Sequence, residues 1–395
     1  MKYMGGKTAL LGGRLGEILL SEADSASRFV DLFGGSGAVA HFAAQHLKLP
    51  ILSVDLQEYA RVFASAVIER TCSLVGDPAL TGWLATPVAT LAGHEPIPVT
   101  ADLVHAARVA AAAEPEGFIT RHYGGHYFSL SQAQTLDSLY AALPASGALR
   151  TVALAALLQA ASACAAAPGH TAQPFQPTAT LLPYIRQAWT RDVSESARIA
   201  VEQIAPAFAA VRGEARVGDA QSVVETLQEG DLVFCDPPYS AVQYSRFYHV
   251  LEGIARGGWD EVGGKGRAPA RTRRETSEFS MKSKAPAAMK KLVAGLRQCG
   301  CRAIITFPNA DASNGLSAND IIAMTEDDWI VRAHYVDSVH STLGGRSGSG
   351  PRGGRKKLKE AVLVLSPRSS VVSMPVKFPP GSIEADGDRV AAGVL

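Results

Sequence analysis

The feature that most constrains the fold of this chain is a short apolar segment near its start that ends in a glycine-rich turn. Residues 28–33 have the pattern of a buried strand, and Gly34-Gly35-Ser36-Gly37 follows. A helical pattern covers residues 37–47, and residues 51–55 have the pattern of a second buried strand. Strand, helix and strand in this order predict a βαβ unit. We therefore expect a parallel sheet that holds its ligand at the carboxyl ends of the strands.

Two acidic residues, one before this turn and one at the end of the second strand, indicate what kind of ligand is bound. Glycines let the backbone approach a ligand closely, and the next helix offers unpaired N–H groups and a partial positive charge. Asp31 precedes the turn and Asp55 closes the second strand. An acid at the second position accepts hydrogen bonds from a ribose diol in nucleotide-binding sheets, and the alternative for Asp55 is a helix N-cap. The turn by itself is weak evidence, because dinucleotide-binding enzymes use a related one.

The rest of the chain divides by composition and apolar pattern into a sheet-forming part and a helical part. Alanine-rich helical segments interrupted by Pro and Gly run from about Tyr59 to Val211. Strands are expected at 231–235, 301–307, 330–339 and 361–365, and helices at 7–20, 245–256 and 286–298. The pattern predicts an α/β domain built from residues 1–60 and 212–366. It also predicts a mainly helical inserted domain at 61–211, a mobile loop at 257–284 and a loosely ordered tail at 367–395.

A second motif, Asp236-Pro237-Pro238-Tyr239, stands at the end of the predicted strand 231–235. The two prolines fix the backbone and remove two donors, which leaves the Pro237 carbonyl free to accept a hydrogen bond. A carboxylate beside that carbonyl and an aromatic face two residues later make a pocket suited to a planar amino group. As a bare turn the tetrapeptide would be unremarkable, but its place at a strand end beside a nucleotide-binding turn favours a catalytic role.

These motifs resemble those of the Dam-like group of DNA adenine N6-methyltransferases, which includes the modification enzymes of restriction systems. Lys2-Tyr3-Met4-Gly5-Gly6-Lys7 is similar to the N-terminal cofactor motif of that family, residues 31–37 to its main cofactor loop, and residues 236–239 to its catalytic motif. Residues 243–252 are similar to the segment that follows the catalytic motif in many restriction-associated members. The resemblance covers both ends of the catalytic domain well and the helical segment only in patches.

The resemblance implies a Rossmann-like sheet that binds S-adenosylmethionine, with an inserted helical domain for DNA recognition. It implies that Asp219 contacts the cofactor's adenine, although Asp219 follows the helical segment where the family order usually has this acid before it. An aspartate at position 236 favours adenine over cytosine as the target base. The cofactor contacts implied in this way are Tyr3, Lys7, Asp31, Phe33, Gly35, Gly37, Asp55 and Asp219.

The target base would have to leave the duplex, because its amino group is hydrogen-bonded inside the base stack. Tyr239 would then stack on the flipped base. Hydrogen bonds to Asp236 and the Pro237 carbonyl would favour the pyramidal amino group that attacks the methyl donor. This reaction needs no covalent enzyme intermediate. We therefore expect Asp236, Pro237, Pro238 and Tyr239 to form the catalytic centre.

Uneven charge indicates where DNA would lie. Residues 265–297 contain ten Lys or Arg and two acids, and residues 346–359 contain six Lys or Arg and no acid, while the whole chain has a net charge of only +1. We expect these windows to hold the phosphate backbone and the helical segment to contact bases, although solvated surface is the alternative for each residue. The candidates for DNA contact are Arg121, His122, Tyr123, Gln173, Tyr244, Arg273, Lys282 and Lys356.

Several further expectations concern partners and environment. The five cysteines are scattered and show no metal-binding spacing, so we expect reduced thiols and no metal. No stretch approaches ~20 uninterrupted apolar residues, which predicts a cytoplasmic protein without a membrane span. We expect a monomer that acts on duplex DNA, with a cognate restriction endonuclease as a candidate partner. The alternatives are an adenine methyltransferase acting on RNA and a catalytically silent DNA-binding module.

Overall fold

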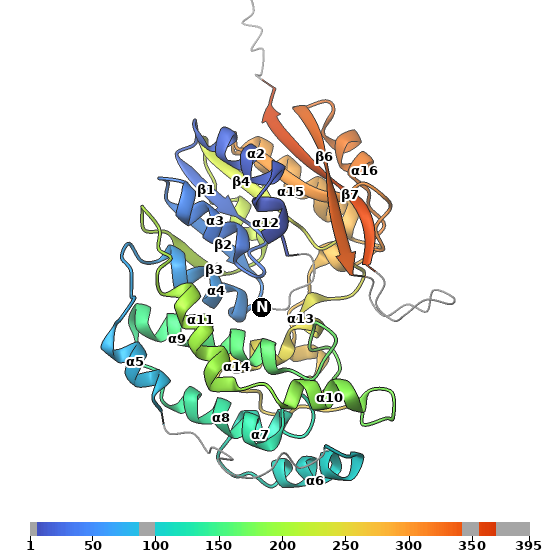
Figure 1. The fold of residues 1–395 in the computed structure, drawn as a ribbon. Helices are drawn as coiled ribbons and strands as arrows, with labels where there is room; N and C mark the ends of the chain where they lie inside the picture. Colours follow the sequence, from blue (N-terminus) through green and yellow to red (C-terminus); the bar gives the residue numbers. More distant parts are fainter. Residues whose placement is uncertain (1–5, 87–98, 342–354, 369–395) are drawn as a thin grey trace, which may run out of the picture.

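A seven-stranded, mostly parallel sheet organises the protein in the computed structural model, which describes residues 6–86, 99–341 and 355–368 (Figure 1). The strand order is β3-β2-β1-β4-β5-β7-β6. Strands β1 to β5 are parallel, and β7 is antiparallel to both of its neighbours. The expected α/β fold with a parallel sheet is therefore confirmed. The strands are β1 Arg28–Asp31, β2 Ile51–Asp55, β3 Glu214–Val217, β4 Asp231–Cys235, β5 Arg302–Pro308, β6 Trp329–Ser341 and β7 Arg355–Pro367.

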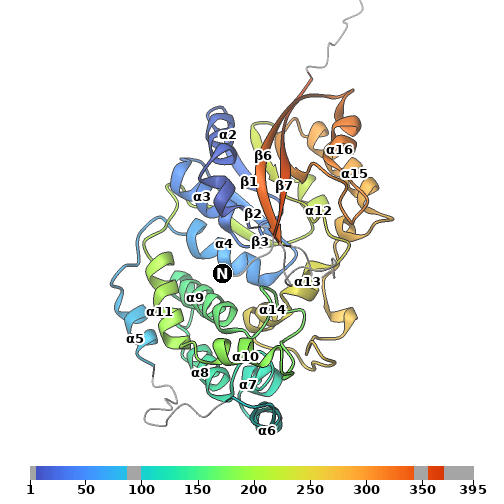
Figure 2. The ribbon, with the colours of Figure 1, turned by 45° about the vertical axis from the view of Figure 1, so that its right-hand side comes forward.

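Helices cover both faces of this sheet, which explains why its central strands are apolar on both sides. Side chains alternate between the faces along a strand, so Phe29 belongs to the buried cluster that contains α2, α3 and α4, whereas Val30 belongs to the one that contains α12, α15 and α16. Figure 2 shows the two helical layers on either side of the strands. The helices of these layers are α1 Thr8–Leu11, α2 Arg14–Ala23, α3 Ala38–His46, α4 Glu58–Ile68, α12 Ala220–Val224, α15 Ala285–Gln298 and α16 Ala318–Thr325.

Two predicted helices are each divided in the structure. The segment expected to be helical from Lys7 to Leu20 forms α1 and α2, which are separated at Gly12 and Gly13. The segment expected at 245–256 forms α13 Tyr244–Phe247 and α14 His249–Arg256. Helix α16 was not predicted, although Ser317 and Asp320 form a capping box at its start.

The described residues between α4 and β3 form seven further helices. Figure 1 shows them with α14 below the sheet. Their apolar side chains belong to the same buried cluster as those on one sheet face, from Phe29 of β1 through Phe63 of α4 to Leu157 of α9. The boundary expected between residues 60 and 61 falls inside α4, which packs against β2 and α9. These helices are α5 Pro78–Leu84, α6 Ala101–Ala112, α7 Phe118–Tyr123, α8 Leu130–Ala141, α9 Gly147–Cys164, α10 Leu182–Trp189 and α11 Val193–Ile204.

The segment 257–284, which was expected to be a mobile loop, is tied to the helices by hydrogen bonds. Arg267 Nε donates to the His122 carbonyl at 2.9 Å, and Tyr127 Oη donates to the Gly266 carbonyl at 2.7 Å. The segment also contains two short 3-10 helices, Arg271–Arg273 and Glu278–Ser280. Composition alone did not show that buried side chains of distant helices would fix this loop.

Helix α9 is the one helix in the described residues that is long and apolar enough to cross a membrane. It has 18 residues, and 61% of this stretch is buried inside the protein. Its neighbours are α4, α5, α8, α11 and α14. In this structure α9 is therefore the central core helix of the helical layer, and its apolar composition follows from that position.

Candidate active site

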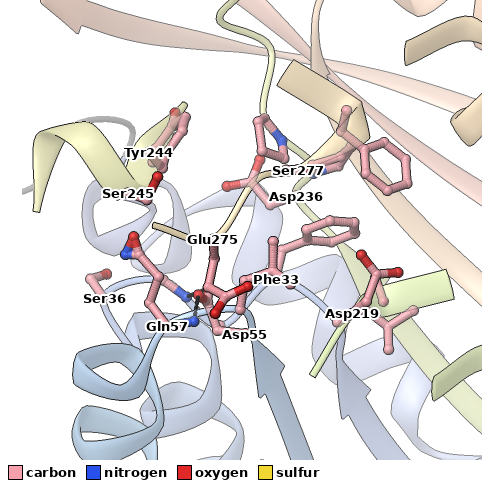
Figure 3. Close-up of a pocket in the computed structure, with 18 of the residues that line it drawn as sticks. Phe33, Ser36, Asp55, Gln57, Asp219, Asp236, Tyr244, Ser245, Glu275 and Ser277 are labelled. Carbon is pink, nitrogen blue, oxygen red and sulfur yellow. Dashed lines mark hydrogen bonds between the residues drawn. The ribbon is translucent and has the colours of Figure 1, made fainter. Parts of the chain in front are cut away.

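A pocket lies at the carboxyl ends of β1, β2 and β4, the place that the βαβ pattern predicts for a ligand. It contains about 990 Å³ of empty space, including the part that is open to solvent. Figure 3 shows Gln57 and Asp219 on opposite sides of it, with Asp236 and Tyr244 above them. The predicted residues that line it are Lys7, Phe33, Gly35, Asp55, Asp219, Asp236, Pro237, Pro238, Tyr239 and Tyr244.

The glycine-rich turn and Asp55 form one end of the pocket. Gly35 and Gly37 have φ angles of 50° and 76°, in the left-handed region that glycine adopts easily. The Gly35 N–H donates to one Asp55 carboxylate oxygen and the Gln57 N–H to the other, both at 2.9 Å. Burial raises the pKa of Asp55 to about 6, and these two hydrogen bonds limit the rise. Asp55 is thus a preformed acceptor, and the N-cap position of α4 belongs to Gln57 instead.

The Gln57 side chain has two unmatched polar atoms. Its amide oxygen and nitrogen are both buried, and neither has a hydrogen-bond partner within the described residues. Because Gln57 lines the pocket, a bound ligand can satisfy both atoms. Sequence reasoning did not select Gln57, although its place two residues after Asp55 was a usable signal.

Two of the expected cofactor residues, Asp31 and Gly37, do not line the pocket directly. Asp31 is buried, accepts from the Phe33 N–H at 3.3 Å, and leaves its Oδ2 atom without a partner among the described residues. Burial raises the pKa of Asp31 to about 8. Gly37 is the N-cap of α3, where its left-handed φ angle ends the turn. Tyr3 lies outside the described residues.

The opposite end of the pocket carries Asp219, which the resemblance places at the cofactor's adenine. Asp219 is the N-cap of α12, and its Oδ1 atom accepts from the Gln221 N–H at 2.8 Å. Phe33 packs edge-on against Phe279, with ring centroids 5.2 Å apart. An acid and two aromatic rings therefore surround this end of the pocket.

The motif 236–239 forms the third side of the pocket. Asp236 Oδ1 accepts from the Thr306 hydroxyl and pairs with Lys7 Nζ, both at 2.8 Å. No hydrogen bond or ion pair within the described residues occupies its Oδ2 atom or the Pro237 carbonyl. Burial raises the pKa of Asp236, while Lys7 acts to lower it and Glu360 to raise it further. Asn314 fixes the motif by donating to the Pro238 carbonyl at 2.8 Å.

A segment far from these motifs in the sequence completes the pocket. Gln243 and Ser277 exchange two hydrogen bonds, from Gln243 Nε2 to the Ser277 carbonyl at 2.9 Å and from the Ser277 N–H to Gln243 Oε1 at 2.7 Å. This exchange holds residues 275–279 over the pocket, which Glu275, Ser277 and Phe279 line. None of these side chains was predicted from the sequence, because the pairing joins segments 34 residues apart.

The residues predicted to contact DNA have different environments. Tyr123 is fully buried and His122 is 5% exposed, so neither side chain offers a surface to DNA in this structure, which corrects that prediction. Arg121 is half-buried and donates to the Pro115 carbonyl at 3.0 Å, while Gln173 and Lys282 are exposed. Tyr244 lines the active-site pocket. Arg273 pairs with Asp260 at 2.8 Å, and the side chain of Lys356 lies outside the described residues.

A second hollow, of about 780 Å³ counted out to solvent, adjoins the pocket and shares Gln243 and Ser245 with it. Arg246, Arg271 and Arg274 line this hollow, and no carboxylate pairs with them within the described residues. Burial and the charges of Arg246 and Arg271 lower the pKa of Arg274. The three guanidinium groups therefore form a positively charged surface beside the pocket that holds the motif 236–239. The described residues contain no group of three or more His, Cys, Asp or Glu side chains that could hold a metal ion.

Comparisons with known proteins agree with this geometry. The family described as D12 class N6 adenine-specific DNA methyltransferase matches residues 3–294, which include the glycine-rich turn and the motif 236–239. Modification methylase LlaI of Lactococcus lactis subsp. lactis is 48% identical over 56 residues, which are 14% of this chain and 9% of that relative. The family match confirms the resemblance that the motifs indicated. The chain therefore belongs to the D12 class N6 adenine-specific DNA methyltransferase family.

Proposed function

We propose that this protein transfers a methyl group from S-adenosylmethionine to the N6 amino group of an adenine in duplex DNA. Membership of the family implies this donor and DNA as the substrate. The observation that carries the proposal is that no group of the described residues occupies the Asp236 Oδ2 atom or the Pro237 carbonyl, in the same pocket as Asp55 and Gln57. A planar amino group can donate one N–H to each of these two acceptors.

The residues at the other end of the pocket fit the methyl donor. Asp55 would accept from the ribose hydroxyls, and Gln57 supplies one donor and one acceptor that are otherwise unmatched. Asp219 and the Phe33 ring would hold the adenine, and the buried Asp31 would accept from the amino-acid end of the donor. When bound, the donor supplies an electrophilic methyl group on a sulfonium.

The catalytic motif would act on the target base by position and charge. Tyr239 would stack on a flipped adenine, and hydrogen bonds to Asp236 and Pro237 would draw the amino nitrogen out of conjugation with the ring. The nitrogen would then present its lone pair to the methyl group. A carbon–nitrogen bond would form as the carbon–sulfur bond breaks, the demethylated donor would leave as a neutral thioether, and the excess proton on nitrogen would pass to solvent. This step needs no nucleophile from the protein.

The arginine-lined hollow supports DNA as the substrate. A phosphodiester carries one negative charge, and guanidinium groups bind it through charge-assisted hydrogen bonds. Because the hollow shares two residues with the active-site pocket, a strand bound there would keep its neighbouring nucleotide at the pocket. We assign Arg246, Arg271 and Arg274 to this contact, together with the exposed Lys282.

We further propose that residues 1–60 and 212–366 form the catalytic part, and that the helices at 61–211 form an inserted domain for target recognition. Arg121 and Gln173 are the candidates that remain for base contacts, because they are not fully buried. We propose that the protein acts in the cytoplasm as a monomer, within restriction-modification or host DNA modification. A cognate endonuclease would be the partner in the first case.

Labelled S-adenosylmethionine tests the proposed function. The purified protein would be incubated with unmethylated duplex DNA and, separately, with RNA, and the nucleosides would then be analysed. We expect N6-methyladenine in DNA. Label only in RNA would favour the RNA methyltransferase, and DNA binding without any transfer would favour the silent module.

A further inference from the structure

A buried cluster of three charged groups lies behind the catalytic motif. Lys7 Nζ is 2.8 Å from Asp236 Oδ1 and 2.8 Å from Glu360 Oε1. The side chains of Lys7 and Glu360 are only 4% and 2% exposed. The three residues come from distant places: Lys7 precedes α1, Asp236 follows β4, and Glu360 lies in β7 opposite Pro308 of β5.

The cluster has one ammonium group for two carboxylates. Glu360 does not line the pocket, whereas Lys7 and Asp236 do, so Glu360 has its closest link to the reacting groups through these two side chains. Its charge also acts on Tyr239. A buried ion pair of Lys7 and Asp236 alone would be balanced, and an additional buried carboxylate is costly. Because burying the Glu360 carboxylate costs free energy, we expect its charge to have a physical role.

Sharing the ammonium changes what Asp236 can do. A carboxylate that has a lysine to itself is a weak acceptor, because the cation withdraws its charge. Glu360 takes part of the Lys7 charge and adds a negative charge nearby, and both effects leave more negative charge on Asp236. Its Oδ2 atom, which faces no partner within the described residues, is then the better acceptor for an amino group.

We propose that Glu360 is a positioning residue for methyl transfer, which divides Lys7 between two carboxylates and so strengthens Asp236 as the acceptor for the target amino group. This inference rests on the proposed function. Glu360 has no contact with the substrate in this assignment, and it acts through the Lys7 ammonium and through its own charge near Asp236.

Other groups around Asp236 bear on how the inference is tested. Asp31 is the neighbour whose titration could be confused with that of Asp236, since burial raises its pKa to about 8. Its remaining influences are the Phe33 N–H, Asp236 and Asp55, and do not include Glu360. A pH effect that arises from Asp31 would therefore stay in place when Glu360 is changed. The titratable groups that act on Asp236 or feel its charge are Lys7, Glu360, Asp31, Cys235, Tyr239 and Tyr244.

The test compares pH–rate profiles of the whole protein on duplex DNA for wild type and Glu360→Gln. The amide oxygen can still accept from Lys7, and Lys7 remains balanced by Asp236, so we expect the variant to fold and to bind the methyl donor with unchanged affinity. Loss of the Glu360 charge lowers the pKa of Asp236, so the acid limb of the profile moves to lower pH. The plateau of kcat falls about tenfold, with little change in KM, because Asp236 becomes a weaker acceptor.

Two further variants separate this role from a structural one. Glu360→Asp keeps the charge and is expected to leave the acid limb near its wild-type position. Asp231→Asn removes an equally buried carboxylate, paired with Arg28 at 2.5 Å at the other end of β4, and should lower the melting temperature without moving the limb. An active wild type whose limb and plateau are unchanged in Glu360→Gln would overturn the inference. A wild type that makes no N6-methyladenine would instead overturn the proposed function.

Discussion

The two parts of this molecule use buried polar groups in different ways. In the sheet part, which comprises β1–β7 with α1–α4, α12, α15 and α16, buried charges gather at the carboxyl edge, and Asp236 and Gln57 leave atoms available to a ligand. In the helical part, which comprises α5–α11, α13, α14 and residues 257–284, several buried side chains bind the backbone instead, although Thr120 Oγ1, Tyr123 Oη and Trp189 Nε1 have no hydrogen-bond partner among the described residues. There, Gln132 Nε2 donates to two carbonyls at 3.0 and 2.8 Å, and Tyr127 Oη donates to that of Gly266.

This difference indicates that the sheet part carries the groups that act on ligands and that the helical part fixes the path of the chain. A side chain that donates to a backbone carbonyl fixes the path of the chain and has no capacity left for a substrate. The open acceptors of the sheet part need a ligand to complete them. Substitutions in the sheet part should therefore change rate or cofactor affinity, and those in the helical part should change stability.

The strongest contrast is between two aspartates, Asp236 in the sheet part and Asp137 in the helical part. Asp236→Ala should reduce methyl transfer by about 100-fold or more, because it removes the acceptor for the target amino group. Cofactor binding, measured by calorimetry, should remain. Asp137 accepts from the Ile119 and Thr120 N–H groups at 2.9 and 2.8 Å at the start of α7, so Asp137→Asn should lower the melting temperature and leave the rate unchanged.

A single-turnover assay with labelled donor measures both rates. An Asp236→Ala protein that keeps more than about a tenth of the wild-type rate would remove Asp236 from the catalytic centre. An equal loss of rate in Asp137→Asn would show that the two parts are not separable in this way.

Asp55 tests the cofactor end of the sheet part. Asp55→Asn exchanges an acceptor oxygen for a donor, and a charged hydrogen bond contributes about 1.5–3 kcal/mol, so the donor's Kd should rise roughly 10- to 100-fold. In the wild type, cofactor binding should weaken as the pH falls through about 6, since burial raises the pKa of Asp55 to that value and only the carboxylate accepts two hydroxyls. Titration calorimetry between pH 5 and 8 measures both effects. A Kd that is unchanged in Asp55→Asn would contradict the assignment.

The sequence predicted the parts of the site that form from neighbouring residues. The turn at 34–37 and the motif at 236–239 each follow a strand directly, so their places at the sheet edge could be inferred from the strand pattern. Glu360 and Ser277 could not be found in this way. Their positions depend on the register of β7 against β5 and on a pairing with Gln243, which no local pattern contains.

The helical part was harder to predict for a related reason. Polar and aromatic side chains such as His122 and Tyr123 looked suitable for DNA, yet both are buried against residues of the 249–267 segment. An alanine-rich helix buries small side chains all round, so its periodicity does not show which face meets a neighbour. The basic composition of 257–284 likewise suggested mobility where the structure has fixed contacts.

The arginine-lined hollow lies where the two parts meet and predicts a moderate effect on DNA binding. Arg274→Ala should weaken binding several-fold and reduce the slope of log affinity against log salt by about one, because one phosphate contact is lost. Arg198→Ala is the control, since Arg198 is exposed on α11 and already paired with Glu195 and Glu202. Fluorescence anisotropy across a salt series measures both slopes. Equal slopes in wild type and Arg274→Ala would contradict the assignment of the hollow to phosphate contact.

The smallest expected effects come from two helical glycines in the helical part. A Cβ atom on Gly253 of α14 would lie 2.5 Å from Trp259 Nε1 and 2.9 Å from Tyr123 Oη, where α14 packs against the 257–284 segment and α7. Gly253→Ala should lower the free energy of unfolding by about 1–3 kcal/mol, because these neighbours must shift. A Cβ atom on Gly82 of α5 would meet nothing within 4 Å, so Gly82→Ala should raise the free energy of unfolding by up to about 1 kcal/mol through a better helix propensity.

Chemical denaturation of both variants provides the measurement, and the methyl-transfer rate at low temperature is the companion readout. Glu252, the neighbour of Gly253, holds the first N–H groups of α4 at 3.1 and 3.0 Å, so a shift of α14 would be transmitted to the sheet part through this cap. If the helical part only supports the shape of the site, the Gly253→Ala protein should be less stable, and its folded fraction should transfer methyl groups at the wild-type rate. A loss of rate in the folded variant would show that the position of α14 also sets the geometry of the active site.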